Sequence, residues 1–278
     1  MAKGLVNRII PFSSVDGPGN RAAIFLQGCN FNCLYCHNPE TINLCRNCFI
    51  CVKECPYGAL SVEEGIVLWN NNLCKKCDIC LKCCPYHSSP KVVAMETEEV
   101  VTIVKRISGF ISGVTVSGGE CMLQSEFLIS LFEKMKDMNL TTFIDTNGSI
   151  PFQDNQKLIS VMDMAMIDVK SFDSEEHKKL TGMDHSIVLK NVEFLGNIGK
   201  LYEIRTVIVP DILDNYSNVD SISRLIAKIN PSIRYKLIKY RPLGVRKELM
   251  ESCIPSDAMM NELAGLSKAN GCNNVVIT

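Results

Sequence analysis

Hydrophobic and polar positions follow two periods that alternate along most of the chain. Short apolar runs, typical of buried strands, are followed by stretches whose apolar residues recur three or four positions apart, as on one face of a helix. The strand candidates are residues 22–27, 113–117, 141–145, 164–169, 201–209, 233–239 and 274–277. The helix candidates are residues 97–107, 123–135, 154–162, 174–181, 186–198, 217–229 and 256–269. Thr97 is the expected cap of the first of these helices.

Repeated strand–helix alternation predicts a parallel sheet joined by right-handed crossovers. A closed eightfold barrel of such units takes about 250 residues. Residues 41–90 break the alternation and carry regularly spaced cysteines instead. The rest of the chain has room for about six units. We therefore expect an α/β fold, namely an open, partial (β/α)6 barrel of residues 1–40 and 91–278. Residues 41–90 would be a small domain inserted into its first crossover.

Charge and composition narrow the class of protein. Lys and Arg total 29 against 30 acidic residues, which leaves no basic surface for nucleic acid or an anionic membrane. The N-terminus, MAKGLVNRII, lacks the apolar core of an export signal, and no apolar run is long enough to span a bilayer. We expect a cytoplasmic protein. The cytosol keeps thiols reduced, so the 15 cysteines of this chain indicate metal or iron–sulfur ligation rather than disulfides.

Three cysteines follow the first strand candidate directly. Cys29, Cys33 and Cys36 form a C-x3-C-x2-C motif. Thiolates are the usual ligands of [4Fe–4S] clusters, and three of them leave the fourth iron open. A reactive site keeps such an open position, which here could chelate an amine together with a carboxylate. The alternative is a zinc site with His37 as its fourth ligand, but His37 adjoins Cys36, which is poor geometry for one metal ion.

The block 41–90 repeats a second cysteine pattern, C-x2-C-x2-C-x3-C-P. This is the spacing of bacterial two-cluster ferredoxins, in which each fourth cysteine binds the other cluster. The predicted ligand sets are Cys45, Cys48, Cys51 with Cys84, and Cys74, Cys77, Cys80 with Cys55. A block this short buries little core, so clusters would help to hold it folded. We favour an electron relay, with structural staples or zinc sites as alternatives. Cys83, beside Cys84, could compete as a ligand.

Polar motifs follow several strand candidates, at the end where parallel barrels place their active sites. The Gly-Gly pair at 118–119 lets the backbone approach a ligand closely. Glu120 after it can accept hydrogen bonds from an ammonium group. Asp145 and Asp168 end the next two strands, as a general acid/base pair or as solvated turn residues. Arg205 lies within a strand and needs an acidic partner if buried, so a structural ion pair is one interpretation.

The three-cysteine spacing resembles that of the radical SAM superfamily. The segments VDGPGNR at 15–21 and FLQGCNFNCLYCHNP at 25–39 resemble the glycyl-radical-enzyme activating enzymes, with the YjjW-type activases the most similar subgroup. The resemblance covers most of the chain. It implies that S-adenosylmethionine binds at the open iron of the cluster.

The same resemblance implies roles for individual residues. Gly118, Gly119 and Glu120 would hold the methionyl amine of S-adenosylmethionine. Its carboxylate and a monovalent cation would be surrounded by Asp145, Thr146, Met166 and Asp168, with Lys170 in reach of the carboxylate. Tyr35 and His37 lie in the region that contacts adenine, and Arg241 stands where related activases often carry histidine. Asp16 would lie near Arg205, close to the docking site of a glycine loop, so Asp16, Lys170 and Arg205 are the expected catalytic residues.

The implied reaction is reductive cleavage of S-adenosylmethionine to methionine and a 5′-deoxyadenosyl radical. The radical would abstract a hydrogen atom from a backbone glycine of a partner glycyl radical enzyme. A flavodoxin- or ferredoxin-type reductant would supply electrons through the inserted clusters, which makes three [4Fe–4S] clusters in all. The alternatives are a radical SAM enzyme that acts on a small molecule, and a ferredoxin-type electron carrier. The segment 16–21 argues against the former, and Cys29, Cys33 and Cys36 against the latter.

Overall fold

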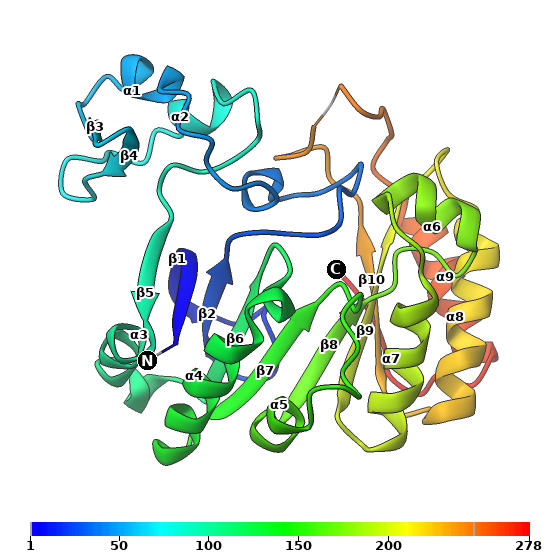
Figure 1. The fold of residues 1–278 in the computed structure, drawn as a ribbon. Helices are drawn as coiled ribbons and strands as arrows, with labels where there is room; N and C mark the ends of the chain where they lie inside the picture. The colour runs from blue at the N-terminus through cyan, green and yellow to red at the C-terminus, as the bar shows by residue number, and fades with distance from the viewer. Residues whose placement is uncertain (1, 247) are drawn as a thin grey trace.

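The computed structural model describes residues 2–246 and 248–278 of the chain. A nine-stranded sheet runs through it in the order β11-β10-β9-β8-β7-β6-β2-β1-β5, with helices along its outer face (Figure 1). The strands are β1 (Lys3–Ser13), β2 (Arg21–Leu26), β5 (Val93–Glu96), β6 (Gly113–Gly118), β7 (Thr141–Thr146), β8 (Met164–Asp168), β9 (Leu201–Ile208), β10 (Arg234–Lys239) and β11 (Val275–Ile277). The helices are α3 (Thr97–Lys105), α4 (Ser125–Asp137), α5 (Gln156–Val161), α6 (Ser174–Thr181), α7 (Ser186–Asn197), α8 (Asn215–Ile229) and α9 (Asp257–Ala269).

The expected α/β architecture is confirmed. Strands β2 and β6 to β11 run parallel and follow one another across the sheet, with a helix in each crossover from β6 onward. The order of the strands is linear, so the barrel is open and partial, as the sequence predicts. Strand β2 is buried at all its positions, as a strand covered on both faces must be.

Two strands at one edge of the sheet were not predicted. β1 pairs antiparallel with β2, and β5 pairs antiparallel with β1. The β1 segment mixes polar and apolar residues without strict alternation, and its pairing with β2 contains two register shifts. Such irregular strands leave a weak periodic signal. The cap of α3 is also Glu96 rather than Thr97, because Glu96 and Glu99 form a reciprocal capping box.

Apolar stripes on the helices bury the sheet. The sequence predicts an apolar stripe from Leu123 to Met135, and its members on α4 are buried, namely Phe127, Leu128, Leu131, Phe132 and Met135. Each such side chain contributes about 1.5–3 kcal/mol when buried. Leu123 precedes α4 and is exposed. Within the described residues, none of the helices has the length and apolar character that crossing a membrane requires.

Residues 41–90 form a separate small layer above the β1–β2 end of the sheet (Figure 1). They contain the short helices α1 (Ile50–Glu54) and α2 (Ile79–Lys82) and the hairpin of β3 (Leu60–Glu63) and β4 (Ile66–Trp69). The backbone repeats itself: Asn47 and Phe49 flank Cys48 with positive φ, and Lys76 and Asp78 flank Cys77 in the same way. Both halves of the cysteine repeat therefore adopt the same turn.

Candidate active site

A cavity of about 420 Å³ lies at the carboxyl ends of β2, β6, β7, β8 and β9. Most residues predicted for the site line it, although they come from segments far apart in the chain. These are Asp16, Cys29, Cys33, Tyr35, Cys36, His37, Gly118, Gly119, Asp145, Thr146, Asp168, Lys170 and Arg205. The predicted residues Glu120 and Met166 are instead fully buried behind the wall of the cavity. Parallel strands that end on the same edge explain this convergence.

Backbone hydrogen bonds fix the start of the cysteine loop. The N–H of Gly28 donates to the carbonyl of Thr41 at 2.8 Å, and the N–H of Cys29 donates to the carbonyl of Ile42 at 3.0 Å. Gly28 has a φ of 103°, a left-handed conformation that glycine adopts without strain. The chain therefore turns sharply at the end of β2, and the segment that follows the loop lies against its first cysteine.

The middle of the loop is held from two other elements. The N–H groups of Asn32 and Leu34 donate to carbonyls in the last turn of α6. Arg246, from the segment after β10, donates to Asn32 Oδ1 at 2.7 Å and to the carbonyl of Cys33 at 2.8 Å. Arg246 is buried, and the sequence analysis missed it because no motif links this position to the cysteine loop. It also places a positive charge near the Cys36 thiol.

The protonation of the thiols shows what the site requires. Burial raises the pKa of Cys29 to about 12 and that of Cys33 to about 11, and it raises the pKa of Cys36 as well. The thiolate forms therefore need the charge of a bound metal group, and binding releases protons. Soft thiolate donors suit iron–sulfur clusters. Among residues 2–246 and 248–278, no three His, Cys, Asp or Glu side chains are placed to hold a single metal ion. A multi-iron cluster fits this donor set.

The Gly118–Gly119 wall owes its composition to close backbone packing. A Cβ on Gly118 would lie 2.1 Å from the carbonyl oxygen of Leu26, and one on Gly119 would lie 2.1 Å from that of Gly28. Only glycine fits at either position. Glu120, the next residue, stabilises this wall through hydrogen bonds on the side away from the cavity.

Glu120 accepts hydrogen bonds from the N–H groups of Met122 and Asn147 at 3.0 and 2.8 Å and from Thr146 Oγ1 at 2.7 Å. These bonds connect the end of β6 to the end of β7. Burial raises the pKa of Glu120 to about 7 despite the three donors. Its carboxylate oxygens face these protein groups, whereas the two glycines face the cavity.

Charged side chains form the floor of the cavity. Arg205 donates to Asp145 Oδ1 at 2.9 Å and to Glu203 Oε1 at 2.5 Å, and Lys170 donates to Asp168 Oδ2 at 2.7 Å. Burial raises the pKa of Asp145 to about 6, even though Arg205 opposes the shift. Burial opposes ionisation of Asp168 too, but Lys170 and then Arg205 outweigh it and lower its pKa. The floor offers both cationic donors and carboxylates to a ligand.

Arg205 has buried carboxylate partners, as the structural interpretation required. Arg205 Nη2 lies 3.0 Å from the sulfur of Met166, and this contact helps to bury Met166. Asp16 lines the same cavity, and it accepts a hydrogen bond from Ser13 Oγ through its side chain and one from Thr115 Oγ1 through its backbone carbonyl. The structure thus brings Asp16 and Arg205 to one cavity, with Asp145 and Glu203 as the direct partners of Arg205.

Two aromatic residues of the cysteine loop face different neighbours. Tyr35 is 1% exposed, and its hydroxyl has no hydrogen-bond partner within the described part of the chain, although it lies at the cavity. His37 Nε2 lies 3.1 Å from the carbonyl of Arg241, and its ring packs near that of Tyr240. The Tyr35 hydroxyl is an unsatisfied polar atom that a polar ligand in the cavity would satisfy.

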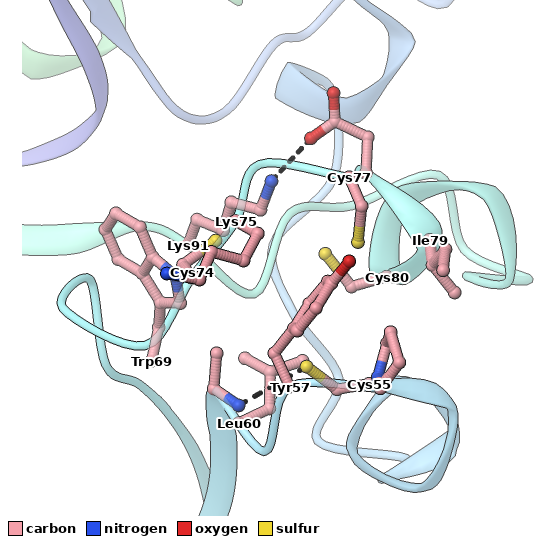
Figure 2. A pocket seen from close by; sticks show the side chains of 13 residues that line it. Cys55, Tyr57, Leu60, Trp69, Cys74, Lys75, Cys77, Ile79, Cys80 and Lys91 are labelled. Carbon is pink, nitrogen blue, oxygen red and sulfur yellow. Dashed lines mark hydrogen bonds and ion pairs between the residues drawn. The ribbon is translucent and has the colours of Figure 1, made fainter.

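The cysteines of residues 41–90 gather around two hollows. One is lined by Cys45, Cys48, Cys51 and Cys84, and the other by Cys55, Cys74, Cys77 and Cys80 (Figure 2). In each set the fourth member comes from the other half of the repeat, as the ferredoxin spacing predicts. Backbone N–H groups point at several sulfurs, for example Ala59 to Cys55 and Lys76 to Cys74, both at 3.4 Å. Cys83 lines neither hollow.

Comparison with known proteins gives one consistent answer. The family model described as "Radical SAM superfamily" matches residues 23–218. The chain is 32% identical to the 4-hydroxyphenylacetate decarboxylase activating enzyme of Clostridioides difficile (strain CD196), over 88% of this chain and 84% of that protein. It is 29% identical to a putative glycyl-radical enzyme activating enzyme of Haemophilus influenzae, over 98% and 95% of the two chains.

A solved structure supports the fold. A radical SAM methyltransferase from Sphaerobacter thermophilus superposes with a TM-score of 0.60, at 13% identity, over all of this chain and 77% of that one. The family match spans most of the barrel, including the three-cysteine loop and the strand ends around the cavity. The chain therefore belongs to the radical SAM superfamily and, within it, to the glycyl-radical-enzyme activating enzymes.

Proposed function

We propose that this chain cleaves S-adenosylmethionine with one electron and uses the resulting carbon radical to activate a partner glycyl radical enzyme. The observation that carries the proposal is the convergence of the three-cysteine loop, the Gly118–Gly119 wall and the charged floor on one cavity. Cys29, Cys33 and Cys36 would hold a [4Fe–4S] cluster with one open iron. When bound, the cluster supplies the electron, and S-adenosylmethionine supplies the radical that abstracts hydrogen from a backbone glycine.

The residues of the cavity would hold the cofactor by its charged groups. Lys170 and Arg205 can donate to a carboxylate, and Asp145 and Asp168 can accept from an amine or share a monovalent cation with that carboxylate. Gly118 and Gly119 allow the backbone to approach the methionyl group. The Tyr35 hydroxyl, which has no hydrogen-bond partner among the described residues, would contact a polar part of the ligand.

The Asp16 and Arg205 pair would act on the protein substrate. Both line the cavity, Asp16 from the loop between β1 and β2 and Arg205 from β9. Together with Lys170 they are the residues we assign to positioning the glycine segment and the cofactor for hydrogen abstraction. The open edge of the partial barrel leaves space for such a segment.

Residues 41–90 would form a ferredoxin-like domain with two further [4Fe–4S] clusters. The two four-cysteine hollows and the repeated turns around Cys48 and Cys77 support this assignment. The domain would relay electrons from a flavodoxin- or ferredoxin-type reductant. We place the protein in the cytoplasm, because its many free thiols require a reducing compartment.

The direct test is cleavage of S-adenosylmethionine by anaerobically reconstituted, dithionite-reduced protein. We expect 5′-deoxyadenosine from the wild type and none from Cys33→Ala. Cys272→Ala is the matched control, because Cys272 is also buried but does not line the cavity. A Cys33→Ala protein that still forms 5′-deoxyadenosine at the wild-type rate would refute the site. A glycine-centred radical signal in a co-incubated candidate glycyl radical enzyme tests the second half of the proposal.

Iron analysis tests the inserted domain. Three cubanes correspond to about twelve irons per chain. A value of about four would remove the two inserted clusters while leaving the barrel site intact.

A further inference from the structure

The contacts between residues 41–90 and the barrel single out one of the two four-cysteine sets. We propose that the set Cys45, Cys48, Cys51 and Cys84, called here the proximal set, delivers the electron to the three-cysteine loop. The set Cys55, Cys74, Cys77 and Cys80, the distal set, would lie one step earlier on the route. This inference rests on the proposed function, in which both sets hold [4Fe–4S] clusters and residues 41–90 act as a relay.

The first route between the proximal set and the loop is almost entirely covalent. Cys29 donates its backbone N–H to the carbonyl of Ile42 at 3.0 Å. From Ile42 the chain continues through Asn43 and Leu44 to Cys45, a member of the proximal set. Ile42 is buried and lines the cavity itself. This hydrogen bond is therefore the one non-covalent step between the backbone of Cys29 and that of Cys45.

A second route reaches the same set from its other end. Cys84 Sγ lies 3.5 Å from Ser88 Oγ, in a hydrogen bond. Ser88 is 2% exposed and forms a parallel β-bridge with Asn43. The Asn43 side chain adds a bond of 2.9 Å to the carbonyl of Tyr86. Both strands that join residues 41–90 to the barrel thus meet beside the proximal set.

Gln27 locks this junction to the end of β2. Its side-chain nitrogen donates to the carbonyl of Glu40 at 2.7 Å and to that of Asn43 at 2.6 Å. Gln27 is 2% exposed and directly precedes the turn into Cys29. Partly buried hydrogen bonds therefore hold the start of this connection next to the end of β2.

The hydrogen bonds of the distal set lead away from the three-cysteine loop. Cys55 Sγ accepts from the N–H of Ala59 at 3.4 Å, and Ala59 accepts from Asn70. These bonds lead into the β3–β4 hairpin, which forms a sheet of its own. This set meets the segment returning to the barrel at Lys91, which lines its hollow and pairs with Asp78 at 2.5 Å. The Asp78 side chain is half exposed. The distal set is thus placed to receive electrons from outside.

The step is a simple electron transfer. The external one-electron reductant, of the flavodoxin or ferredoxin class, is oxidised by one electron for each S-adenosylmethionine cleaved. No bond forms or breaks within residues 41–90. S-adenosylmethionine held in the cavity would take up that electron and give methionine and the 5′-deoxyadenosyl radical.

The test compares Cys48→Ala with Cys77→Ala, two exposed cysteines at equivalent places in the repeat. Reconstituted proteins are photoreduced with a small deazaflavin and frozen after milliseconds, and electron paramagnetic resonance measures reduction of the three-cysteine cluster. The double variant gives the background of direct reduction. We expect Cys77→Ala to exceed that background several-fold and Cys48→Ala to equal it. The opposite order, or equal values, would overturn the proposal.

A second pair keeps every cysteine in place. Ser88→Thr retains the hydroxyl beside Cys84, and Ser88→Val has the same shape without it. We expect several-fold slower reduction of the three-cysteine cluster in Ser88→Val, with iron content and the spectrum of each cluster unchanged. Ser89→Val, at an equally buried neighbour, is the control. Equal rates in the Thr and Val variants would overturn the route through Cys84 and Ser88, even if a cysteine variant failed to fold.

The two proposals fail in different ways. If reduced wild-type protein forms no 5′-deoxyadenosine, the proposed function is wrong. If it forms 5′-deoxyadenosine while the variants do not differ in transfer, only the order of the two sets is wrong.

Discussion

Arg246 provides a quantitative test of how the cysteine loop is held. Its guanidinium makes short hydrogen bonds to Asn32 Oδ1 at 2.7 Å and to the Cys33 carbonyl at 2.8 Å, and a longer one to the Asn32 carbonyl at 3.3 Å. A hydrogen bond to a charged group contributes about 1.5–3 kcal/mol. Counting only the two short bonds, Arg246→Leu should cost about 3–6 kcal/mol of local stability. The Cys33 carbonyl would keep only the N–H of Cys36 as a donor, at 3.2 Å.

The assay is retention of the three-cysteine cluster in anaerobic protein. Release of iron to a chelator should be faster in Arg246→Leu than in wild type. The reduction potential of the cluster should also become more negative, because a fixed positive charge beside it is lost. Arg246→Lys keeps the charge but not the planar fork, so it should restore the potential more than the retention.

The matched control is Arg241→Leu. Arg241 is an exposed arginine of the same segment, and its backbone carbonyl lies within hydrogen-bond distance of His37 Nε2. Because that contact uses the backbone, the substitution should leave iron release and potential at wild-type values. If Arg246→Leu behaves like Arg241→Leu in both measurements, the guanidinium does not anchor the loop and the reasoning fails.

Three further predictions concern the barrel and its metal. Arg21 is fully buried and makes five hydrogen bonds to neutral acceptors, so Arg21→Met should cost at least as much as the about 3–6 kcal/mol worked out for Arg246, measured by denaturant unfolding. The exposed Arg8 bonds Asn38 and contacts Phe25, and Arg8→Met should cost under about 1 kcal/mol. Burial lowers the pKa of His177 to about 4. Its contribution to stability is therefore present above its unfolded pKa of about 6.5 and is lost as the pH falls through 4. His177→Phe should weaken the dependence of the unfolding midpoint on pH over that range, and an unchanged pH profile would contradict this. Chelation of iron should expose residues 41–90 to protease before the barrel, because their core is small; simultaneous cleavage would count against it.

The regular strands could be predicted from the sequence because their burial is periodic. Strands β6 and β8, for example, are apolar runs with buried centres, and helices such as α4 carry apolar stripes at helical spacing. β1 escaped prediction because it is an edge-side antiparallel strand with mixed exposure and irregular register. Local patterns reveal elements whose stability is local, whereas β1 depends on β2 and β5 for its hydrogen bonds.

The candidate site divides in the same way. The cysteines and the strand-end motifs could be found because the residues of each motif lie close together in the sequence. Arg246 and Asn147 could not be assigned roles, although Asn147 donates to Asn30 and lies near the sulfur of Cys29. Their partners are more than a hundred residues away. Glu120 shows the reverse case, since the motif predicted a ligand contact and the structure gives its carboxylate three donors from the protein itself.

The place of the insertion also has a physical rationale. A relay domain attached at one terminus would be held by a single linker, and its distance from the active site would fluctuate with the length of that linker. Residues 41–90 are instead connected at both ends, and the two connections pair with each other at Asn43 and Ser88. Gln27 then binds the pair to β2. Closing the segment at both ends restricts its motion relative to Cys29, which the proposed electron relay would require.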